Sequence, residues 1–183
     1  MLRRKGKSHG AKETRGKYSK GKSIRKRDKS VYSRQESGHR EADTAVSGQG
    51  KSKACFAALA ERKTRFYIAV KIPGRKAETM ENAIVAALSA FPAQLVKTIT
   101  CARGTEFANW LQIEERLHCE VYFADPYCAW QKGAIENLNG LLREFYPRGR
   151  NLSRVAPATL KRDLALLNAR PRKVLNFYSA HLW

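Results

Sequence analysis

The clearest pattern along the chain is an alternation of apolar and more polar positions over residues 65–72. From Phe66 onward, every second residue is strongly apolar, as expected of a strand with one face against a core. The segments Asp43–Val46 and Ala54–Leu59 predict two earlier strands, with Gln49-Gly50 as the turn between them. The first part of the chain therefore predicts three consecutive strands.

Helical spacing takes over after the third strand. Met80, Ile84 and Leu88 fall on one face of a helix, which Pro92 would end. Short apolar runs predict strands at 96–101 and 120–124. Thr105 is a candidate cap for a further helix. The remaining helices are expected at 105–117, from about 131 to just before Pro147, and at 157–168. This order predicts an α/β fold in which helices flank a mixed sheet.

Residues 1–40 differ in composition from the rest of the chain. They are rich in Lys, Arg, Gly and Ser and nearly devoid of apolar residues, with 15 Lys and Arg against 3 acidic residues. Such a segment buries too little surface to offset its ordering entropy. We therefore expect a flexible basic arm that contacts DNA phosphates, with a solvated tail that has no role as the alternative.

Charge and composition limit the kinds of partner and the cellular compartment that we expect for this protein. A net charge of +20 and a pI near 10.2 indicate a polyanionic partner. The chain has four cysteines without CxxC spacing, which favours free thiols in a reducing cytosol over a zinc module. Because no stretch reaches 18 continuous apolar residues and no signal peptide is evident, we expect a cytoplasmic protein without a membrane span.

One helix carries candidate chemistry. Lys132, Glu136, Asn139 and Arg143 are spaced 4, 3 and 4 residues apart, so they form a single polar stripe. A separate apolar stripe would face the sheet, and its members are Ile135, Leu138, Leu142 and Phe145. Spacing alone leaves open an ordinary amphipathic helix with a solvated face.

Short segments resemble a known family and follow one another in its order, from about Leu2 to Leu175. They are Glu61-Arg-Lys-Thr-Arg-Phe66, Gly104-Thr-Glu-Phe-Ala108, Tyr122-Phe-Ala-Asp-Pro-Tyr127, Trp130-Gln-Lys-Gly133, Glu136-Asn137, Asn139-Gly-Leu-Leu-Arg143 and Arg170-Pro-Arg-Lys173. Each is weak alone, but together they are specific. The chain resembles the catalytic region of insertion-sequence transposases of the IS-thirty family.

The resemblance implies a ribonuclease-H-like, integrase-type catalytic core with three acidic residues. Asp43 matches the first acid and Glu136 the last, but the second position is occupied by Ala102. The segment from Gly104 follows directly, and 33 residues separate position 102 from Glu136, as in this family. The acid has therefore been replaced rather than displaced. The family's Trp-Glu-Gly before the first acid reads Arg40-Glu41-Ala42 here.

In intact relatives, the three acids would bind two Mg²⁺ (or Mn²⁺) ions that assist DNA strand nicking and strand transfer. Losing even a group that orients a metal ligand typically costs roughly 10–100-fold. We therefore expect a folded transposase (polynucleotidyl transferase) domain that binds metal weakly and is inactive as encoded. Glu106 and Asp125 could stand in, although they also suit a helix start and a turn. The alternative is a non-enzymatic DNA-binding or dimerising remnant.

The resemblance also implies DNA as partner, both transposon ends and target, with a homo-oligomer associated with the bacterial nucleoid. A basic RNA- or ribosome-binding protein would suit the charge alone but would not explain the motifs. The family's helix-turn-helix region would precede this sequence, so we expect a truncated form with an arm at 1–40, a core at 41–175 and a divergent tail at 176–183. Candidate DNA-binding residues, for which a merely solvated face is the alternative, are Trp130, Lys132, Asn139, Arg143, Arg148 and Arg150.

Overall fold

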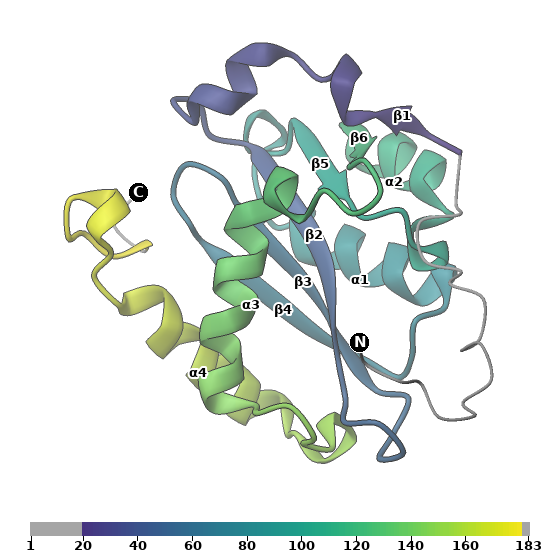
Figure 1. Cartoon of the computed structure of the whole chain (residues 1–183), viewed down its shortest axis with the longest axis vertical. Coiled ribbons are helices and arrows are strands. Elements are labelled where there is room, and N and C mark those ends of the chain that lie inside the picture. The colour runs from purple at the N-terminus through teal and green to yellow at the C-terminus, as the bar shows by residue number, and fades with distance from the viewer. Residues whose placement is uncertain (1–19, 181–183) are drawn as a thin grey trace, which may run out of the picture.

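A six-stranded mixed sheet forms the centre of the computed structural model, which describes residues 20–180 (Figure 1). The order along the sheet is β1-β6-β5-β2-β3-β4. β2, β3 and β4 pair antiparallel, whereas β5, β6 and β1 continue the sheet from β2 in parallel. The strands are β1 Lys22–Ser23, β2 His39–Val46, β3 Cys55–Glu61, β4 Tyr67–Ile72, β5 Thr98–Cys101 and β6 Glu120–Phe123.

Helices cover both faces of the sheet and enclose two cores. In Figure 1, α3 lies in front of the sheet and α1 behind it. Every residue of β3 is buried, because successive side chains of a strand point to opposite faces of the sheet and both faces are covered here. Ala57 and Leu59 join the core with α1 and α2, while Phe56 and Ala58 join the core with α3 and α4. The helices are α1 Ala77–Leu88, α2 Trp110–Leu117, α3 Gly133–Phe145 and α4 Pro157–Ala169. The predicted mixed sheet flanked by helices is confirmed.

Two elements differ from the sequence prediction by more than a residue or two at one end. β2 begins at His39, four residues before the predicted start, because its first residues are polar and the apolar pattern did not mark them. The helix predicted over 105–117 is split into a 3₁₀ turn, Thr105–Phe107, and α2. Thr105 does not cap a helix; Gly104 precedes the 3₁₀ turn and has no side chain to do so.

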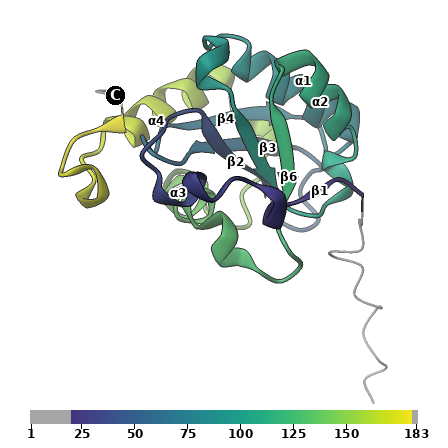
Figure 2. The same cartoon turned by 90° about the horizontal axis from the view of Figure 1, so that it is seen from above.

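Residues 20–40, the end of the expected flexible arm, are docked onto the sheet in this structure. Lys22 and Ser23 pair in parallel with β6, and two 3₁₀ helices follow, Ile24–Lys26 and Lys29–Ser33. Figure 2 shows this segment crossing the molecule beside α3. Ile24 and Val31 are only 1% and 3% exposed, so a few apolar anchors are enough to dock a polar segment onto a preformed sheet. Residues 1–19 of the expected arm lie outside the described residues.

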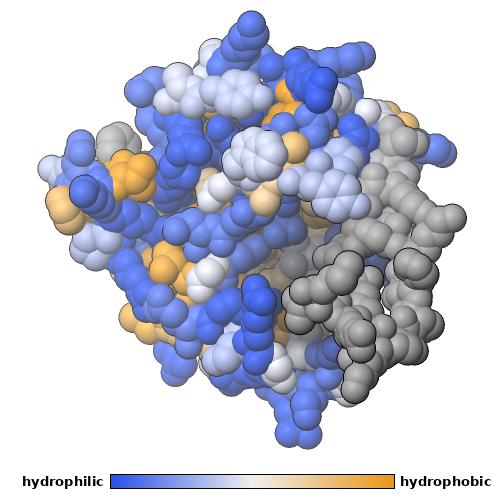
Figure 3. Space-filling view, in the orientation of Figure 1, coloured by the Kyte–Doolittle hydropathy of each residue, from blue (hydrophilic) through white to orange (hydrophobic). Residues whose placement is uncertain are grey.

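The described part of the predicted tail, residues 176–180, folds back on the chain before it. The backbone N–H of Arg172 donates to the carbonyl of Tyr178, and Ala180 is buried. Among residues 20–180, no helix is both long and apolar enough to cross a membrane. The face seen in Figure 1 is mostly hydrophilic, with scattered hydrophobic residues (Figure 3).

Candidate active site

Asp43 lies in the middle of β2, between β3 and β5, with its side chain 30% exposed. Asn139 of α3 donates a hydrogen bond from Nδ2 to Asp43 Oδ2 over 3.0 Å. The Tyr67 hydroxyl in turn donates to Asn139 Oδ1 over 2.6 Å. Burial, and then the charge of Asp43, raise the pKa of Tyr67, which keeps its hydroxyl protonated as a donor. This chain of contacts fixes the amide of Asn139 toward the carboxylate.

Lys132 supplies the nearest cation to this carboxylate. Its Nζ lies 3.6 Å from Asp43 Oδ1, and the lysine is only 6% exposed. The residue ends the 3₁₀ turn Ala129–Lys132, just before α3. Lys132 therefore lies close to Asp43, with little of its surface free to meet a DNA backbone.

A buried carboxylate joins the strand of Asp43 to the helix of Glu136. Glu41 is fully buried, and its Oε2 accepts a hydrogen bond from the backbone N–H of Ile135 over 2.9 Å. Its Oε1 accepts from Arg62 Nη1 in a buried ion pair. Glu41 is two residues before Asp43, and Ile135 directly precedes Glu136. The Glu41 contact therefore holds the two acid-bearing elements in register.

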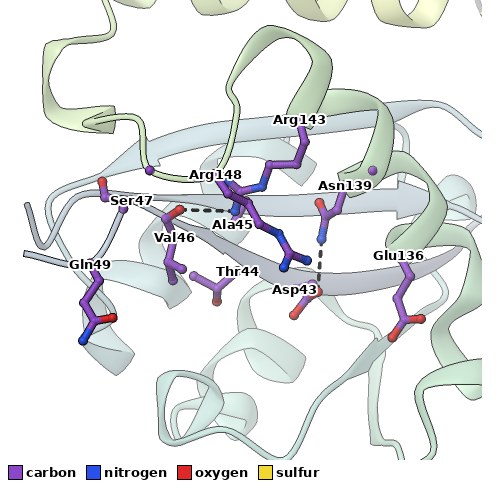
Figure 4. Close-up of a pocket in the computed structure, with 13 residues that line it drawn as sticks. Asp43, Thr44, Ala45, Val46, Ser47, Gln49, Glu136, Asn139, Arg143 and Arg148 are labelled. Atoms are coloured by element: carbon purple, nitrogen blue, oxygen red, sulfur yellow. Dashed lines mark hydrogen bonds between the residues drawn. The ribbon is translucent and has the colours of Figure 1, made fainter. Parts of the chain in front are cut away.

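Asp43 and Glu136 line one cleft of about 620 Å³ (Figure 4). Glu136 is exposed on the first turn of α3. At the far end, the N–H of Gly48 donates to the carbonyl of Arg150 over 3.0 Å, which brings the loop after α3 onto the β2–β3 hairpin. A Cβ on Gly48 would lie 2.4 Å from the Cα of Gly149, so this approach requires glycine. The lining residues are Asp43, Thr44, Ala45, Val46, Ser47, Gly48, Gln49, Glu136, Asn139, Gly140, Arg143, Arg148 and Gly149.

The pairing of β2 with β5 indicates where residue 102 lies relative to Asp43. β2 and β5 are parallel, with Glu41 opposite Thr100. β5 ends at Cys101 and Ala102 is the next residue, so extending this register by two residues would bring Ala102 opposite Asp43. Residues two apart point to the same face, so a carboxylate at 102 would share the face of Asp43. The side chain there is a methyl group.

Within the described residues, Asp43 and Glu136 are not joined by a third acid in a group that could hold a metal ion. Among residues 20–180, no group of three or more His, Cys, Asp or Glu residues gathers in a position to hold a metal ion. Glu106 Oε1 accepts from the Thr44 hydroxyl over 3.3 Å, and Asp125 Oδ2 accepts from Gln131 and Arg25. The residues present therefore do not fit a two-ion site that needs three carboxylates, and a lysine ammonium already lies beside Asp43.

Of the residues predicted to bind DNA, some line the cleft and others lie outside it. Arg143 and Arg148 both line the cleft, and Arg143 Nη2 donates to the carbonyl of Val46 over 3.2 Å. Burial, and then the charge of Arg148, lower the pKa of Arg143. Arg150 lies outside the lining, donates to the carbonyl of Phe145 and has its guanidinium over the ring of Tyr146. Trp130 is also outside the lining and is 73% exposed.

Sequence reasoning did not assign a role to Glu41, Arg62 or Tyr67. Glu41 had one available signal, since residues two apart on a strand share a face and Asp43 was already a candidate. Tyr67 reads as an ordinary strand residue, and only the fold brings its hydroxyl to Asn139.

Comparisons with known proteins agree with this architecture, although no protein-family model matches the chain. It is 35% identical over 176 residues to the transposase InsI of insertion element IS30A from Escherichia coli K12. It is 36% identical over 157 residues to the transposase of IS1086 from Cupriavidus metallidurans. These matches cover 95% and 86% of the chain. Over most of its length, the chain is similar to transposases of the IS30 family.

The IS30-family relatives are longer than the sequence described here. The chain spans about 45% of the length of the E. coli relative and of the IS1161 transposase of Streptococcus salivarius, to which it is 34% identical. It is also 30% identical over 179 residues to a putative integrase of a Spiroplasma virus.

Solved structures support the ribonuclease-H-like fold. The catalytic core of bovine immunodeficiency virus (BIV) integrase matches with a TM-score of 0.58 over 80% of this chain and 92% of that one, at 16% identity. A chain of the simian T-cell lymphotropic virus intasome also matches at 0.58, over 73% of this chain and 49% of that one, at 13% identity. The expected ribonuclease-H-like fold is therefore confirmed.

Proposed function

We propose that this chain is a transposition catalytic domain that retains a DNA-binding cleft but has lost metal-dependent strand nicking and strand transfer. The observation that supports the proposal is the parallel pairing of β2 with β5, whose register, extended by two residues, would bring Ala102 opposite Asp43. A carboxylate at this position would face the same cation as Asp43. With a methyl group there, Asp43 and Glu136 are the two family acids that remain.

Charge supports DNA as the partner. The chain carries a net charge of +20, and Arg143 and Arg148 line the same cleft as the two acids. A DNA backbone that enters the cleft would meet these guanidinium groups, which suit phosphate oxygens. We extend the proposal to a homo-oligomer that acts on transposon ends and target DNA in the bacterial nucleoid.

A second candidate function is DNA binding with no metal at all. The ion pair between Lys132 and Asp43 favours it, because an internal cation already compensates the first acid. The two candidates differ in one measurable property. A weakened catalytic domain binds Mn²⁺ through Glu136, whereas a purely DNA-binding remnant does not.

The test restores the missing acid. Ala102→Asp should raise Mn²⁺ affinity, measured by calorimetry, by more than the roughly 10–100-fold associated with groups that only orient a ligand. Ala102→Asn is the matched control, because it adds similar volume without a charge. The gain should disappear in Ala102→Asp/Glu136→Gln. Strand nicking and strand transfer on duplex DNA are assayed in parallel with Mg²⁺ and Mn²⁺.

Each outcome has a defined meaning. A rise in Mn²⁺ affinity confined to Ala102→Asp supports the loss of a metal ligand at this position. Strong Mg²⁺-dependent nicking by the unchanged chain, abolished by Glu136→Gln, would refute the proposed inactivity. Mn²⁺ binding by the unchanged chain that is lost in Glu136→Gln supports the first candidate, and its absence supports the second.

A further inference from the structure

Three buried arginines lie where the segment after β1 crosses the sheet face that carries α3. Arg27 follows the first 3₁₀ helix of this segment, and Arg62 and Arg65 come from the turn between β3 and β4. They are 3%, 3% and 8% exposed. Burial lowers the pKa of both Arg27 and Arg65, and the positive charge of Arg62 lowers each further. Arg27 and Arg62 meet over neighbouring strands, because Arg27 donates to Thr100 of β5 and Arg62 donates to Glu41, which lies opposite Thr100 on β2. Arg65 completes this positively charged cluster, since the charges of Arg62 and Glu41 both act on it.

The carboxylates nearest to this cluster, those of Glu41 and Glu61, already accept hydrogen bonds from other groups. Glu41 accepts from Arg62 at one oxygen and from the N–H of Ile135 at the other. Glu61, also buried, accepts from the N–H of Gly38 at Oε1 and from the N–H and hydroxyl of Thr64 at Oε2. Three buried cations thus face two carboxylates whose oxygens all have donors.

Several guanidinium donors remain unmatched. Arg27 donates from Nη1 to the Thr100 hydroxyl over 2.7 Å, but its Nε and Nη2 have no hydrogen-bond partner within the part of the chain that the structure describes. The same holds for Nε of Arg62 and Nε of Arg65. A buried cation without a full set of acceptors is costly, and a guanidinium carries five N–H donors that need acceptors. The missing complement is an anion with several acceptor oxygens.

We propose that a phosphate-class oxyanion binds among Arg27, Arg62 and Arg65. Guanidinium groups present paired N–H donors that match the oxygens of such an ion. Tyr32, which is 51% exposed, has its ring 4.8 Å from Arg27 and forms the solvent-side cover. None of the three arginines lines the cleft of Asp43, so this site is separate from the candidate active site and does not depend on its activity.

The ion has two possible sources, free phosphate or a phosphate of a DNA backbone. Burial of all three side chains favours a free ion, because a duplex backbone reaches exposed groups first. Anchoring a small oxyanion here would also tie the segment after β1 to the β3–β4 turn.

The test is calorimetric titration of the full chain with inorganic phosphate in chloride buffer at fixed ionic strength. We expect saturable binding at one site, weakened at least about tenfold in Arg27→Gln, as expected for the loss of a charge-assisted hydrogen bond. Arg65→Gln is a second variant in case the first fails to fold. Arg116→Gln is the matched control, because Arg116 lies on α2 and pairs with Glu81.

A repeat titration with a short duplex bound distinguishes the sources. Undiminished phosphate binding identifies a free ion, whereas competition that is lost in Arg27→Gln identifies a backbone phosphate. The absence of saturable phosphate binding by the unchanged chain would overturn the proposal. Equal losses in Arg27→Gln and Arg116→Gln would do so as well, since they would reveal general attraction to a basic protein.

Discussion

Lys132 Nζ lies 3.6 Å from Asp43 Oδ1, at the position where a bound cation would compensate the first acid of the site. The lysine is almost fully buried, whereas the side chain of Asp43 is 30% exposed. A buried cation beside a half-buried carboxylate stabilises the fold as long as both partners are present. The pair therefore supplies a positive charge beside Asp43 from within the protein itself.

We predict that Lys132→Met lowers the free energy of unfolding by about 1–3 kcal/mol, below the range for fully buried pairs because water reaches Asp43. Urea unfolding monitored by circular dichroism gives the value. Lys161→Met is the matched control, because Lys161 is exposed on α4 and should change stability by less than about 0.5 kcal/mol. Equal stability of Lys132→Met and the unchanged chain would show that the pair contributes nothing.

Glu41 is expected to matter more for stability. Glu41→Gln leaves the buried Arg62 without its charged partner, and breaking such a pair typically costs about 3–5 kcal/mol. Chemical unfolding measures this cost, and Glu41→Gln/Arg62→Met should recover much of it. The control is Glu144→Gln, which removes a half-exposed pair with Arg170 worth at most about 1 kcal/mol. A loss no larger than that of Glu144→Gln would contradict the inferred link between β2 and α3.

The sequence predicted the sheet well where burial follows a simple period. β4 matches the alternation at 65–72, and β3 reads as a continuous apolar run because both of its faces are covered. The first half of β2 escaped prediction because its charged residues are buried. Arg40 lies over the ring of Phe91, and Glu41 pairs with Arg62. Such compensation depends on residues distant in sequence, which a periodic pattern does not contain.

The same limit applies to the candidate site. The 4-3-4 spacing predicted one polar stripe on α3, and three of its residues, Glu136, Asn139 and Arg143, line one cleft in the structure. It did not show that Lys132 turns inward to Asp43, since this residue precedes the regular helix. The docking of residues 20–40 was missed because only a few apolar anchors, among them Ile24 and Val31, hold a segment that is otherwise polar.

DNA binding should depend strongly on salt. If the chain makes ~6–10 phosphate contacts, its affinity for a duplex of arbitrary sequence falls about 10³–10⁵-fold between 50 and 200 mM salt. Arg148→Ala should weaken binding and reduce the slope of log affinity against log salt by about 1, because Arg148 lines the cleft. Fluorescence anisotropy measures both, and Arg116→Ala on the opposite face is the control. A flat salt response would remove DNA as the partner.

Acid stability should depend on Asp163 of α4. Its Oδ2 accepts a hydrogen bond from the Tyr146 hydroxyl over 2.6 Å, and its Oδ1 accepts from Arg162. Burial alone would raise the pKa of Asp163, but these hydrogen bonds outweigh it and lower the pKa. A carboxyl whose pKa is lower in the folded state stabilises the protein above its unfolded pKa, which is about 3.9. That contribution is lost as the pH falls through the folded-state pKa.

Asp163→Asn should therefore lower the free energy of unfolding at pH 7 by about 1–3 kcal/mol, because it weakens the charged hydrogen bonds to Tyr146 and Arg162. The difference from the unchanged chain should shrink as the pH falls below about 4, because the unfolded chain then binds a proton at this carboxyl that the folded chain binds only at lower pH. Urea unfolding at pH 7, 5, 4 and 3 follows this convergence. Glu115→Gln, at an exposed position on α2, should leave the pH profile unchanged. A difference between Asp163→Asn and the unchanged chain that stays constant down to pH 3 would show that the charge of Asp163 does not stabilise this helix.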